Sequence, residues 1–218
     1  MSKRTEMREK RQRAQRTQRI VWIGLFAVLV VALAALFILP NLPKSRPPVN
    51  GLSMGDPNAP VQIQEFADFQ CPGCGYYYLN VEPEIVKKYI KPGKVYYTFT
   101  PLSFLGNESV QAAKAAYCAN EEGKFWDFHD KLFGSQNGEN QGAFADTNLL
   151  GFAEDVRIKD MDAFKQCLAS DKYDQQLADN DQLSQDLSVT STPAFIVNGQ
   201  LTPLDQLESA IDTILASQ

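Results

Sequence analysis

Residues 61–74, which read VQIQEFADFQCPGC, decide the fold expected for this chain. The mainly apolar run Val61–Ala67 predicts a strand, and it leads directly into a Cys-x-x-Cys motif, Cys71-Pro72-Gly73-Cys74. The residues that follow, 75–90, predict a helix. Cys71 therefore lies at a helix start, where unpaired backbone N–H groups and the helix dipole favour a thiolate. A thiolate beside a second thiol is the working part of a thiol–disulfide exchanger.

The N-terminal end of the chain has the features of a membrane anchor. Residues 1–19 contain eight Lys or Arg and two Glu, whereas residues 20–39 carry no charge. An uncharged segment of this length spans about 30 Å as a helix, the thickness of a bilayer's hydrocarbon core. Because basic residues stay on the cytoplasmic side, we expect a cytoplasmic tail, one transmembrane helix and an extracytoplasmic remainder. A cleaved signal peptide is the alternative, since residues 32–34 read Ala-Leu-Ala, although the apolar run continues to Leu39.

The remainder is expected to form a linker and one domain. Residues 40–60 contain six of the twelve prolines, which predicts an extended, semi-rigid spacer. Residues 61–218 are long enough to build one hydrophobic core. The net charge of residues 40–218 is −11, so the acidic domain is not expected to bind nucleic acid.

The predicted elements alternate between strand and helix. Residues 94–100 predict a second strand, parallel to the first, and residues 107–188 are mainly helical. A strand over Ala194–Val197 is followed by a hairpin signal, Asn198-Gly199, and by a final helix. This order predicts an α/β fold.

Four separated stretches, in this order, resemble the DsbA-like branch of the thioredoxin superfamily. They are Gly55–Val61, Glu65–Cys74, Gly123–Asp130 and Ser191–Gly199. The resemblance extends from about Leu52 to the C-terminus. With the residue patterns, it implies a thioredoxin fold with an inserted helical domain at about 107–188, preceded here by the transmembrane helix. One position departs from the pattern, because the DsbA proteins best known as strong oxidants carry His where this chain has Gly73. Oxidising strength is therefore not implied.

Five residues are candidates for the catalytic site. Cys71 is expected to be the nucleophile and Cys74 the more buried resolving thiol. The resemblance implies that Pro193 is cis, lies against the cysteine pair and presents the backbone of Thr192 to a bound chain. Glu65 falls on the apolar face of its strand, where burial should raise its pKa. The resemblance implies that Glu65 relays a proton to or from the buried thiol; pairing with a lysine or exposure to solvent is the alternative.

The other cysteines and the histidine are expected to be structural. Four cysteines in an exported chain fit two disulfides, so Cys118 and Cys167 are expected to pair. Two unconnected buried thiols are the alternative. A zinc site is disfavoured because these cysteines form no second Cys-x-x-Cys motif. His129 lies in an aromatic helical run, which favours a packing role, so we expect no metal.

Together these features predict a membrane-anchored, extracytoplasmic oxidoreductase that introduces disulfides into exported proteins. Its redox-active Cys71–Cys74 disulfide would replace a cofactor. The resemblance implies reoxidation by a quinone-linked membrane enzyme of the DsbB or vitamin K epoxide reductase type. A reductase or isomerase of the same fold is the first alternative, and a tethered binding module without redox activity is the second.

Overall fold

A computed structural model of the chain describes residues 22, 29–30 and 46–217. The predicted cytoplasmic tail, and the predicted transmembrane helix apart from residues 22, 29 and 30, lie outside the described residues. Within the described ranges, no helix has the length and apolar character that crossing a membrane requires. The chain from Arg46 onward forms one unit, to which the following description refers.

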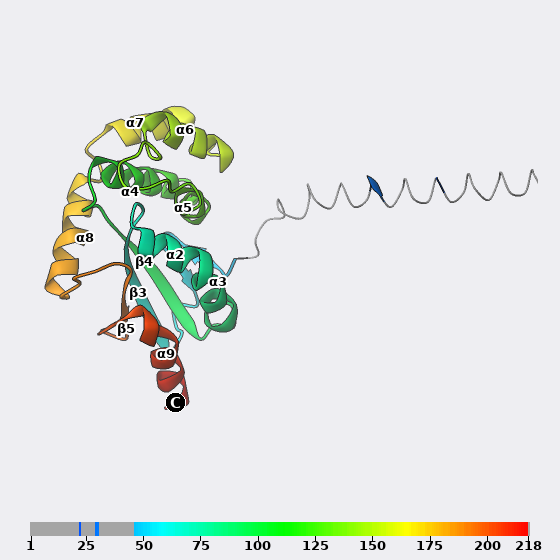
Figure 1. The fold of residues 1–218 in the computed structure, drawn as a ribbon, viewed down its shortest axis with the longest axis vertical. Coiled ribbons are helices and arrows are strands. Elements are labelled where there is room, and N and C mark those ends of the chain that lie inside the picture. The colour runs from blue at the N-terminus through cyan, green and yellow to red at the C-terminus, as the bar shows by residue number, and fades with distance from the viewer. Residues whose placement is uncertain (1–21, 23–28, 31–45, 218) are drawn as a thin grey trace, which may run out of the picture. The chain divides into compact units, whose positions relative to one another are not determined.

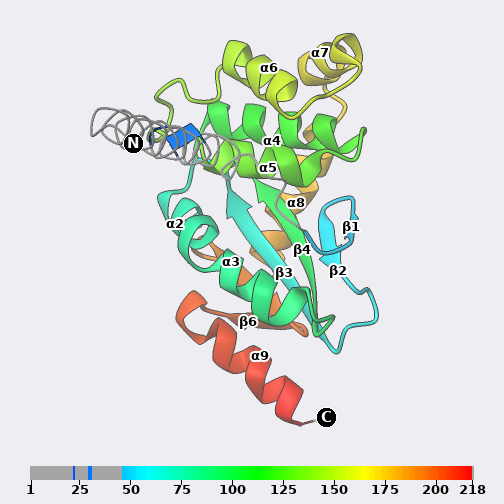
Figure 2. The same cartoon turned by 90° about the vertical axis from the view of Figure 1, so that its right-hand side faces the viewer.

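A six-stranded sheet forms the centre of this unit in the described part of the chain (Figures 1 and 2). The two long strands β3 and β4 pair in parallel, and β5 pairs with β3 in the antiparallel direction. In spatial order the strands are β1 (Val49–Asn50), β2 (Ser53–Gly55), β4 (Val95–Leu102), β3 (Val61–Asp68), β5 (Ala194–Val197) and β6 (Gln200–Thr202). The strand that precedes the cysteine motif is therefore an interior strand of the sheet.

Helices cover the faces and one end of the sheet (Figure 2). They are α2 (Pro72–Asn80), α3 (Glu82–Ile85) with a following π-helical turn (Val86–Ile90), α4 (Asn107–Asn120), α5 (Phe125–Phe133), α6 (Asp146–Asp155), α7 (Met161–Ala169), α8 (Asp174–Asp186) and α9 (Leu207–Ala216). Helices α4 to α7 stack beyond the ends of β3 and β4, while α9 packs against β3 and β5. Helices α4 to α8 thus form one helical segment inserted in the chain between strands β4 and β5.

The position of the cysteine motif follows from the direction of β3. Strands β3 and β4 both run toward the helical stack, so their C-terminal ends meet at that edge of the sheet (Figure 2). In parallel sheets this edge is where ligands and reactive groups gather. Helix α2 begins only four residues after β3 ends, which places the motif at the same edge.

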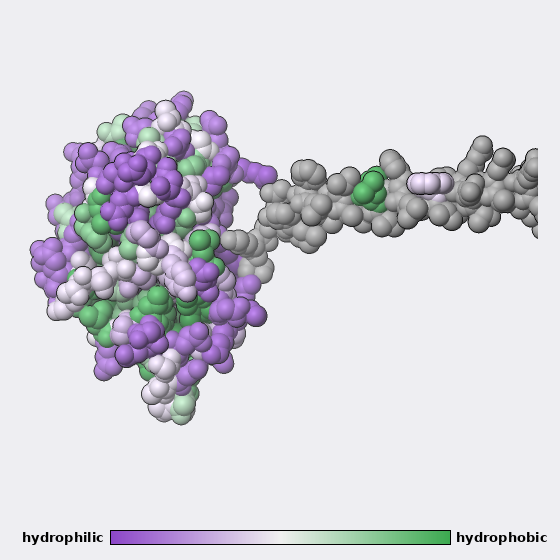
Figure 3. Space-filling model, in the orientation of Figure 1, coloured by the Kyte–Doolittle hydropathy of each residue, from purple (hydrophilic) through white to green (hydrophobic). Residues whose placement is uncertain are grey.

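The structure differs from the expected linker within residues 46–60, whereas residues 40–45 of that linker lie outside the described residues. Residues 49–55 form β1 and β2, and β2 adds to the sheet beside β4 with Met54 opposite Tyr97. Pairing buries Met54 and satisfies backbone groups at the edge of β4, which stabilises strand structure despite the prolines on either side. The domain therefore includes residues that the proline content assigned to a spacer. The face of the domain drawn in Figure 3 is largely hydrophilic with smaller apolar areas, in keeping with its acidic composition.

Candidate active site

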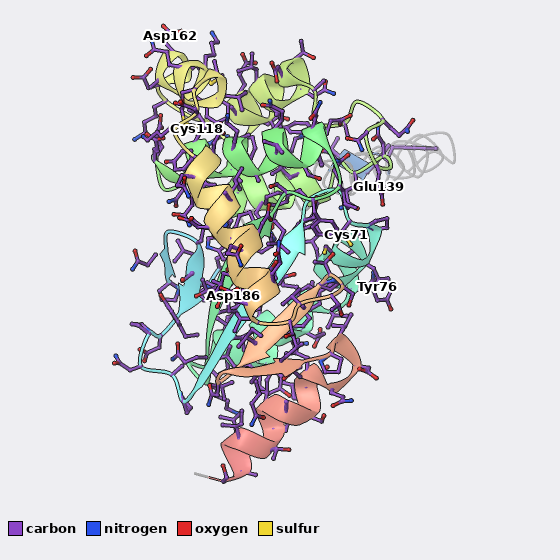
Figure 4. The ribbon with its side chains drawn as sticks, turned by 90° about the vertical axis from the view of Figure 1, so that its left-hand side faces the viewer. Cys71, Tyr76, Cys118, Glu139, Asp162 and Asp186 are labelled. Atoms are coloured by element: carbon purple, nitrogen blue, oxygen red, sulfur yellow. A yellow bond between two sulfur atoms is a disulfide. The ribbon has the colours of Figure 1, made fainter. Side chains whose placement is uncertain are left out.

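Cys71 and Cys74 lie at the start of α2 with very different exposure. Cys71 is the N-cap residue and its carbonyl oxygen accepts the Gly75 N–H at 3.0 Å, while Pro72 occupies the first turn, where an N–H is not required. Neither cysteine is disulfide-bonded here. Cys71 is half-buried, whereas the side chain of Cys74 is fully buried. Figure 4 shows Cys71 on the same side of the domain as Glu139 and Tyr76.

Hydrogen bonds stabilise the thiolate form of Cys71. They lower its pKa from 9.0 to about 6; the bond to the Cys74 thiol is the largest cause, ahead of the Thr192 hydroxyl and the N–H groups of Gly73 and Cys74. The Thr192 hydroxyl donates to the Cys71 sulfur at 3.2 Å. Burial opposes this shift only in part. At neutral pH the outer sulfur is therefore mostly a thiolate, and no imidazole is needed to achieve this.

The inner sulfur has the opposite character. Burial is the main reason that the pKa of Cys74 rises far above its usual 9.0, and the nearby negative groups Cys71 and Glu65 raise it further. Cys74 therefore holds its proton under conditions in which Cys71 has lost its own. This difference suits the first thiol to attack and the second to resolve.

The loop before β5 closes over the motif. The Thr192–Pro193 peptide bond is cis. A β-carbon at Gly73 would lie 3.1 Å from the Thr192 carbonyl oxygen and 3.5 Å from the Pro193 ring. Glycine at this position therefore permits a close approach between the loop and the cysteine pair. The structure brings Thr192 and Pro193 against Cys71 and Cys74, which lie more than 100 positions earlier in the sequence.

Glu65 is buried close enough to the pair to interact electrostatically with both cysteines, with 1% of its surface exposed. Its pKa rises from 4.5 to about 8, chiefly because of burial, while a hydrogen bond from Tyr97 opposes the rise. The Tyr97 hydroxyl donates to the Glu65 carboxylate and lies 3.2 Å from the Tyr77 hydroxyl. Glu65 is not exposed to solvent, which was one alternative, and in the described part of the chain its carboxylate accepts a hydrogen bond from Tyr97 and forms no ion pair with a lysine.

Sequence reasoning did not identify Tyr97 and Tyr77 as part of this site. The alternation of β4 put Tyr97 on one face with Phe99, and parallel pairing then places Tyr97 opposite Ile63, two positions from Glu65. Tyr77 is buried while its neighbour Tyr76 is exposed, which the run of three tyrosines could not distinguish. The alternation of residues along β4 indicates which face of the strand Tyr97 occupies. Its contact with Glu65 depends in addition on the register of β3 against β4, which the alternation does not give.

Gln136 is a second residue that sequence reasoning missed. Its side-chain amide donates to the carbonyl oxygens of Phe69 at 2.7 Å and Cys71 at 3.1 Å. A β-carbon at Gly75 would lie 2.2 Å from the Gln136 amide oxygen, so any other residue at position 75 would displace the Gln136 side chain. Gln136 thus holds the backbone on either side of the reactive cysteine, and no local pattern indicated it.

Cys118 and Cys167 lie away from this site. A disulfide joins them across α4 and α7, with Cα atoms 5.9 Å apart. Cys118 is almost completely buried. His129 is buried among aromatic rings, including Phe99 at a centroid distance of 4.8 Å, and its Nδ1 lies 3.3 Å from an Asp130 oxygen. The helical segment therefore carries its own covalent link, separate from the reactive pair.

A groove of about 390 Å³ begins at Cys71 and extends toward α8. It is lined by the end of β4 and the following loop, by one face of α8 and by the loop that leads to Thr192. The lining residues are Cys71, Leu102, Phe104, Leu105, Glu139, Asp181, Ser184, Gln185, Val189, Thr190, Ser191 and Thr192. The reactive sulfur therefore opens onto a surface large enough to receive a chain segment.

The comparisons with known proteins agree with this geometry. The family profile described as thioredoxin matches residues 48–213. The chain belongs to this family. A probable disulfide bond formation protein D from Bacillus anthracis is 32% identical over 165 residues, covering 73% of this chain and 76% of the relative. The disulfide bond formation protein D of Bacillus subtilis is 30% identical over 151 residues, covering 68% of each chain.

Solved structures point the same way. Oxidised BdbD from Bacillus subtilis superposes with a TM-score of 0.70 at 28% identity, covering 78% of this chain and 96% of that one. The thiol–disulfide exchange protein α-DsbA2 from Wolbachia pipientis gives 0.62 at 25% identity, covering 78% and 88%. This member of the thioredoxin family is a DsbA-like thiol–disulfide oxidoreductase. The alternative of a binding module without redox activity is thereby set aside.

Proposed function

We propose that this protein is a membrane-anchored extracytoplasmic oxidase that transfers the Cys71–Cys74 disulfide to exported proteins. The observation that carries the proposal is the difference between the two sulfurs. Hydrogen bonds lower the pKa of the half-exposed Cys71 to about 6, whereas burial raises that of Cys74. A stabilised Cys71 thiolate stabilises the reduced protein and so makes the disulfide a better oxidant.

The reaction consists of two exchanges. A substrate thiolate attacks the Cys71 sulfur of the disulfide; the Cys71–Cys74 bond breaks, and a mixed disulfide forms. The departing Cys74 sulfur takes up a proton. A second substrate thiolate then attacks the substrate sulfur of the mixed disulfide and releases Cys71 as a thiolate. Two electrons pass from the substrate to the pair, the substrate gains one disulfide, and one of its two protons goes to solvent.

Glu65 is the proposed source of the proton for Cys74. The carboxyl group is buried in the same region, its pKa is about 8, and its charge is among the causes that raise the pKa of Cys74. A group with a pKa near the working pH can both give and accept a proton. Glu65→Gln should therefore slow turnover more than it weakens substrate binding, and an unchanged rate from pH 5 to 9 would argue against the relay.

The N-terminal sequence supports the location. The basic segment 1–19 and the uncharged segment 20–39 favour a single-pass anchor with a cytoplasmic N-terminus. The anchor would hold the domain near a quinone-linked membrane enzyme of the DsbB or vitamin K epoxide reductase type, which reoxidises the pair. Its substrates would be exported proteins that are unfolded or still folding.

The reduction potential of the Cys71–Cys74 couple tests the direction of the reaction. Equilibration with glutathione should give a value between roughly −120 and −270 mV, in the oxidising half of that range. A value at or below that of thioredoxin, about −270 mV, would instead indicate the reductase or isomerase alternative. Cys71→Ser with Cys74→Ser serves as the control that assigns the measured couple to this pair.

A further inference from the structure

The groove beside Cys71 combines apolar walls with acidic side chains. Leu102, Phe104, Leu105 and Val189 supply its apolar lining, and 55% of the Phe104 surface is exposed to solvent. A large aromatic side chain left this exposed beside a reactive sulfur provides contact area for a bound chain. The groove is therefore suited to an aliphatic or aromatic side chain close to the substrate cysteine.

Two carboxylates give the groove a negative charge. Asp181 projects from α8, and Glu139 comes from the loop after α5, which Figure 4 shows near Cys71. Asp181 is held in place by Ser103, whose N–H and hydroxyl donate to its two oxygens at 3.3 and 3.2 Å. Neither donor carries a charge, so the negative charge of Asp181 remains uncompensated by this contact.

Among the described residues, the lining of the groove carries no positive charge to balance these carboxylates. In the part of the chain that the structure describes, no lysine, arginine or histidine lines the groove. The sequence beyond residue 40 is acidic overall, which adds to the negative potential around the site. A cationic side chain brought into the groove would meet attraction without local competition, and an anionic one would meet repulsion.

From this arrangement we propose that the groove selects substrate cysteines that have both a lysine or arginine and an apolar residue close by in the chain. The inference rests on the proposed function, because it names the substrate class for the exchange at Cys71. The apolar residue would contact Phe104 and Leu105, and the cation would lie between Asp181 and Glu139. Selection on charge in addition to apolar character distinguishes this groove from a purely hydrophobic docking surface.

A matched set of peptides tests the proposal with the oxidised full-length protein in detergent. Each peptide carries one cysteine and one leucine. The three peptides differ from one another at a single position, within three residues of the cysteine, which is Lys, Gln or Glu. The rate of mixed-disulfide formation should be about tenfold higher for the Lys peptide than for the Glu peptide at low salt, because each attraction or repulsion at a partly exposed site changes the rate a few-fold. Raising the ionic strength to 1 M should reduce this ratio.

The groove variant is Asp181→Asn with Glu139→Gln, and the control is Asp186→Asn with Asp162→Asn. Both remove two negative charges, but Asp186 lies on α8 outside the groove lining and Asp162 lies on α7 (Figure 4). The groove variant should reduce the Lys-to-Glu ratio to about twofold or less, whereas the control variant should keep most of it. An equal loss in both variants would show that net charge rather than the groove is responsible, and would overturn the proposal.

The apolar part of the proposal has its own variant. Phe104→Ser should slow the reaction of the oxidised protein with the Lys peptide more than its reaction with reduced glutathione, since this tripeptide has no large apolar side chain to contact Phe104. Failure of the wild type to form a mixed disulfide even with the Gln peptide would count against the proposed oxidase function. Formation of mixed disulfides with the Lys, Gln and Glu peptides at equal rates would leave that function intact and overturn the charge selection alone.

Discussion

Cys71 and Cys74 lie three positions apart at the start of one helix, whereas Cys118 and Cys167 lie 49 positions apart on α4 and α7. In the first pair, hydrogen bonds and the open groove make one sulfur accessible and acidic. In the second pair, one sulfur is buried in the helical stack and the bond closes a long loop. The two cysteine pairs thus differ in reactivity because different groups surround their sulfurs. They differ in their effect on stability because the disulfides of the two pairs close chain segments of very different length.

The largest effect is expected from removing the outer sulfur of the reactive pair. Cys71→Ser should abolish exchange, because the buried Cys74 cannot reach a substrate. Cys74→Ser should keep the attacking thiolate and accumulate mixed disulfides that are visible on non-reducing gels. Alkylation of the reduced protein near pH 6 should label Cys71 first; preferential labelling of Cys74 would reverse the two roles.

Removal of the second pair should affect stability and not exchange. Cys118→Ala with Cys167→Ala opens a loop of 49 positions, which should lower the free energy of unfolding by about 4 kcal/mol in the chain-entropy estimate. Urea unfolding measures the loss, and glutathione exchange below the unfolding transition should proceed at the wild-type rate. Slower exchange by the folded variant would show that the two pairs are coupled.

Glu65 should make stability fall as pH rises. Between its usual pKa of 4.5 and its folded value of about 8, the folded protein keeps a proton that the unfolded chain has released. Stability therefore decreases across this window, and the full loss is present above pH 8. Between pH 5 and 7, oxidised wild type should lose about 2 kcal/mol relative to Glu65→Gln. Parallel stability curves for the two proteins would contradict the raised pKa.

The oxidised protein is the right form for this measurement because Cys71 titrates with the opposite sign. Its folded pKa of about 6 lies below the usual 9.0, so the stabilisation of the reduced protein is present above pH 9 and is lost as pH falls through 6. Comparing reduced and oxidised protein should therefore show reduction becoming more stabilising as pH rises from 6 to 9. The Cys118–Cys167 disulfide has no such dependence.

Tyr97→Phe should raise the Glu65 pKa further, by about one unit, because the variant loses a hydrogen bond to the charged form. Carbon-13 NMR of the carboxyl group measures the shift. Tyr77→Phe is the matched control, since its hydroxyl contacts Tyr97 rather than Glu65, and it should give a smaller change. Equal shifts in both variants would indicate a general change in packing.

The smallest effect is expected at Gly73. Gly73→His places an imidazole beside Cys71 and should lower its pKa by about one unit, making the couple about 30 mV more oxidising. The variant must also accommodate a β-carbon 3.1 Å from the Thr192 carbonyl oxygen. Gly73→Ala carries the same β-carbon without the ring. If alanine alters the potential as much as histidine does, the close approach and not the imidazole is responsible.

Local patterns in the sequence determined the elements nearest the reactive pair. The apolar run before the motif predicted β3, and the motif itself predicted the start of α2, as the structure has them. Strand alternation placed Glu65 on an apolar face, which is the basis for expecting a raised pKa. These features depend on residues within a few positions of each other, so neighbouring side chains and backbone geometry are sufficient to specify them.

Only the tertiary structure decided which distant residues meet. Residues 49–55 become strands because the edge of β4 is available, against the local signal of the prolines. Tyr97 contacts Glu65 through the register of β3 and β4, and Gln136 holds the backbone of Cys71 from a loop 65 positions away. The groove draws its lining from several separate segments of the chain. Such contacts arise when whole elements pack and pair with one another. Short stretches of neighbouring residues do not determine them.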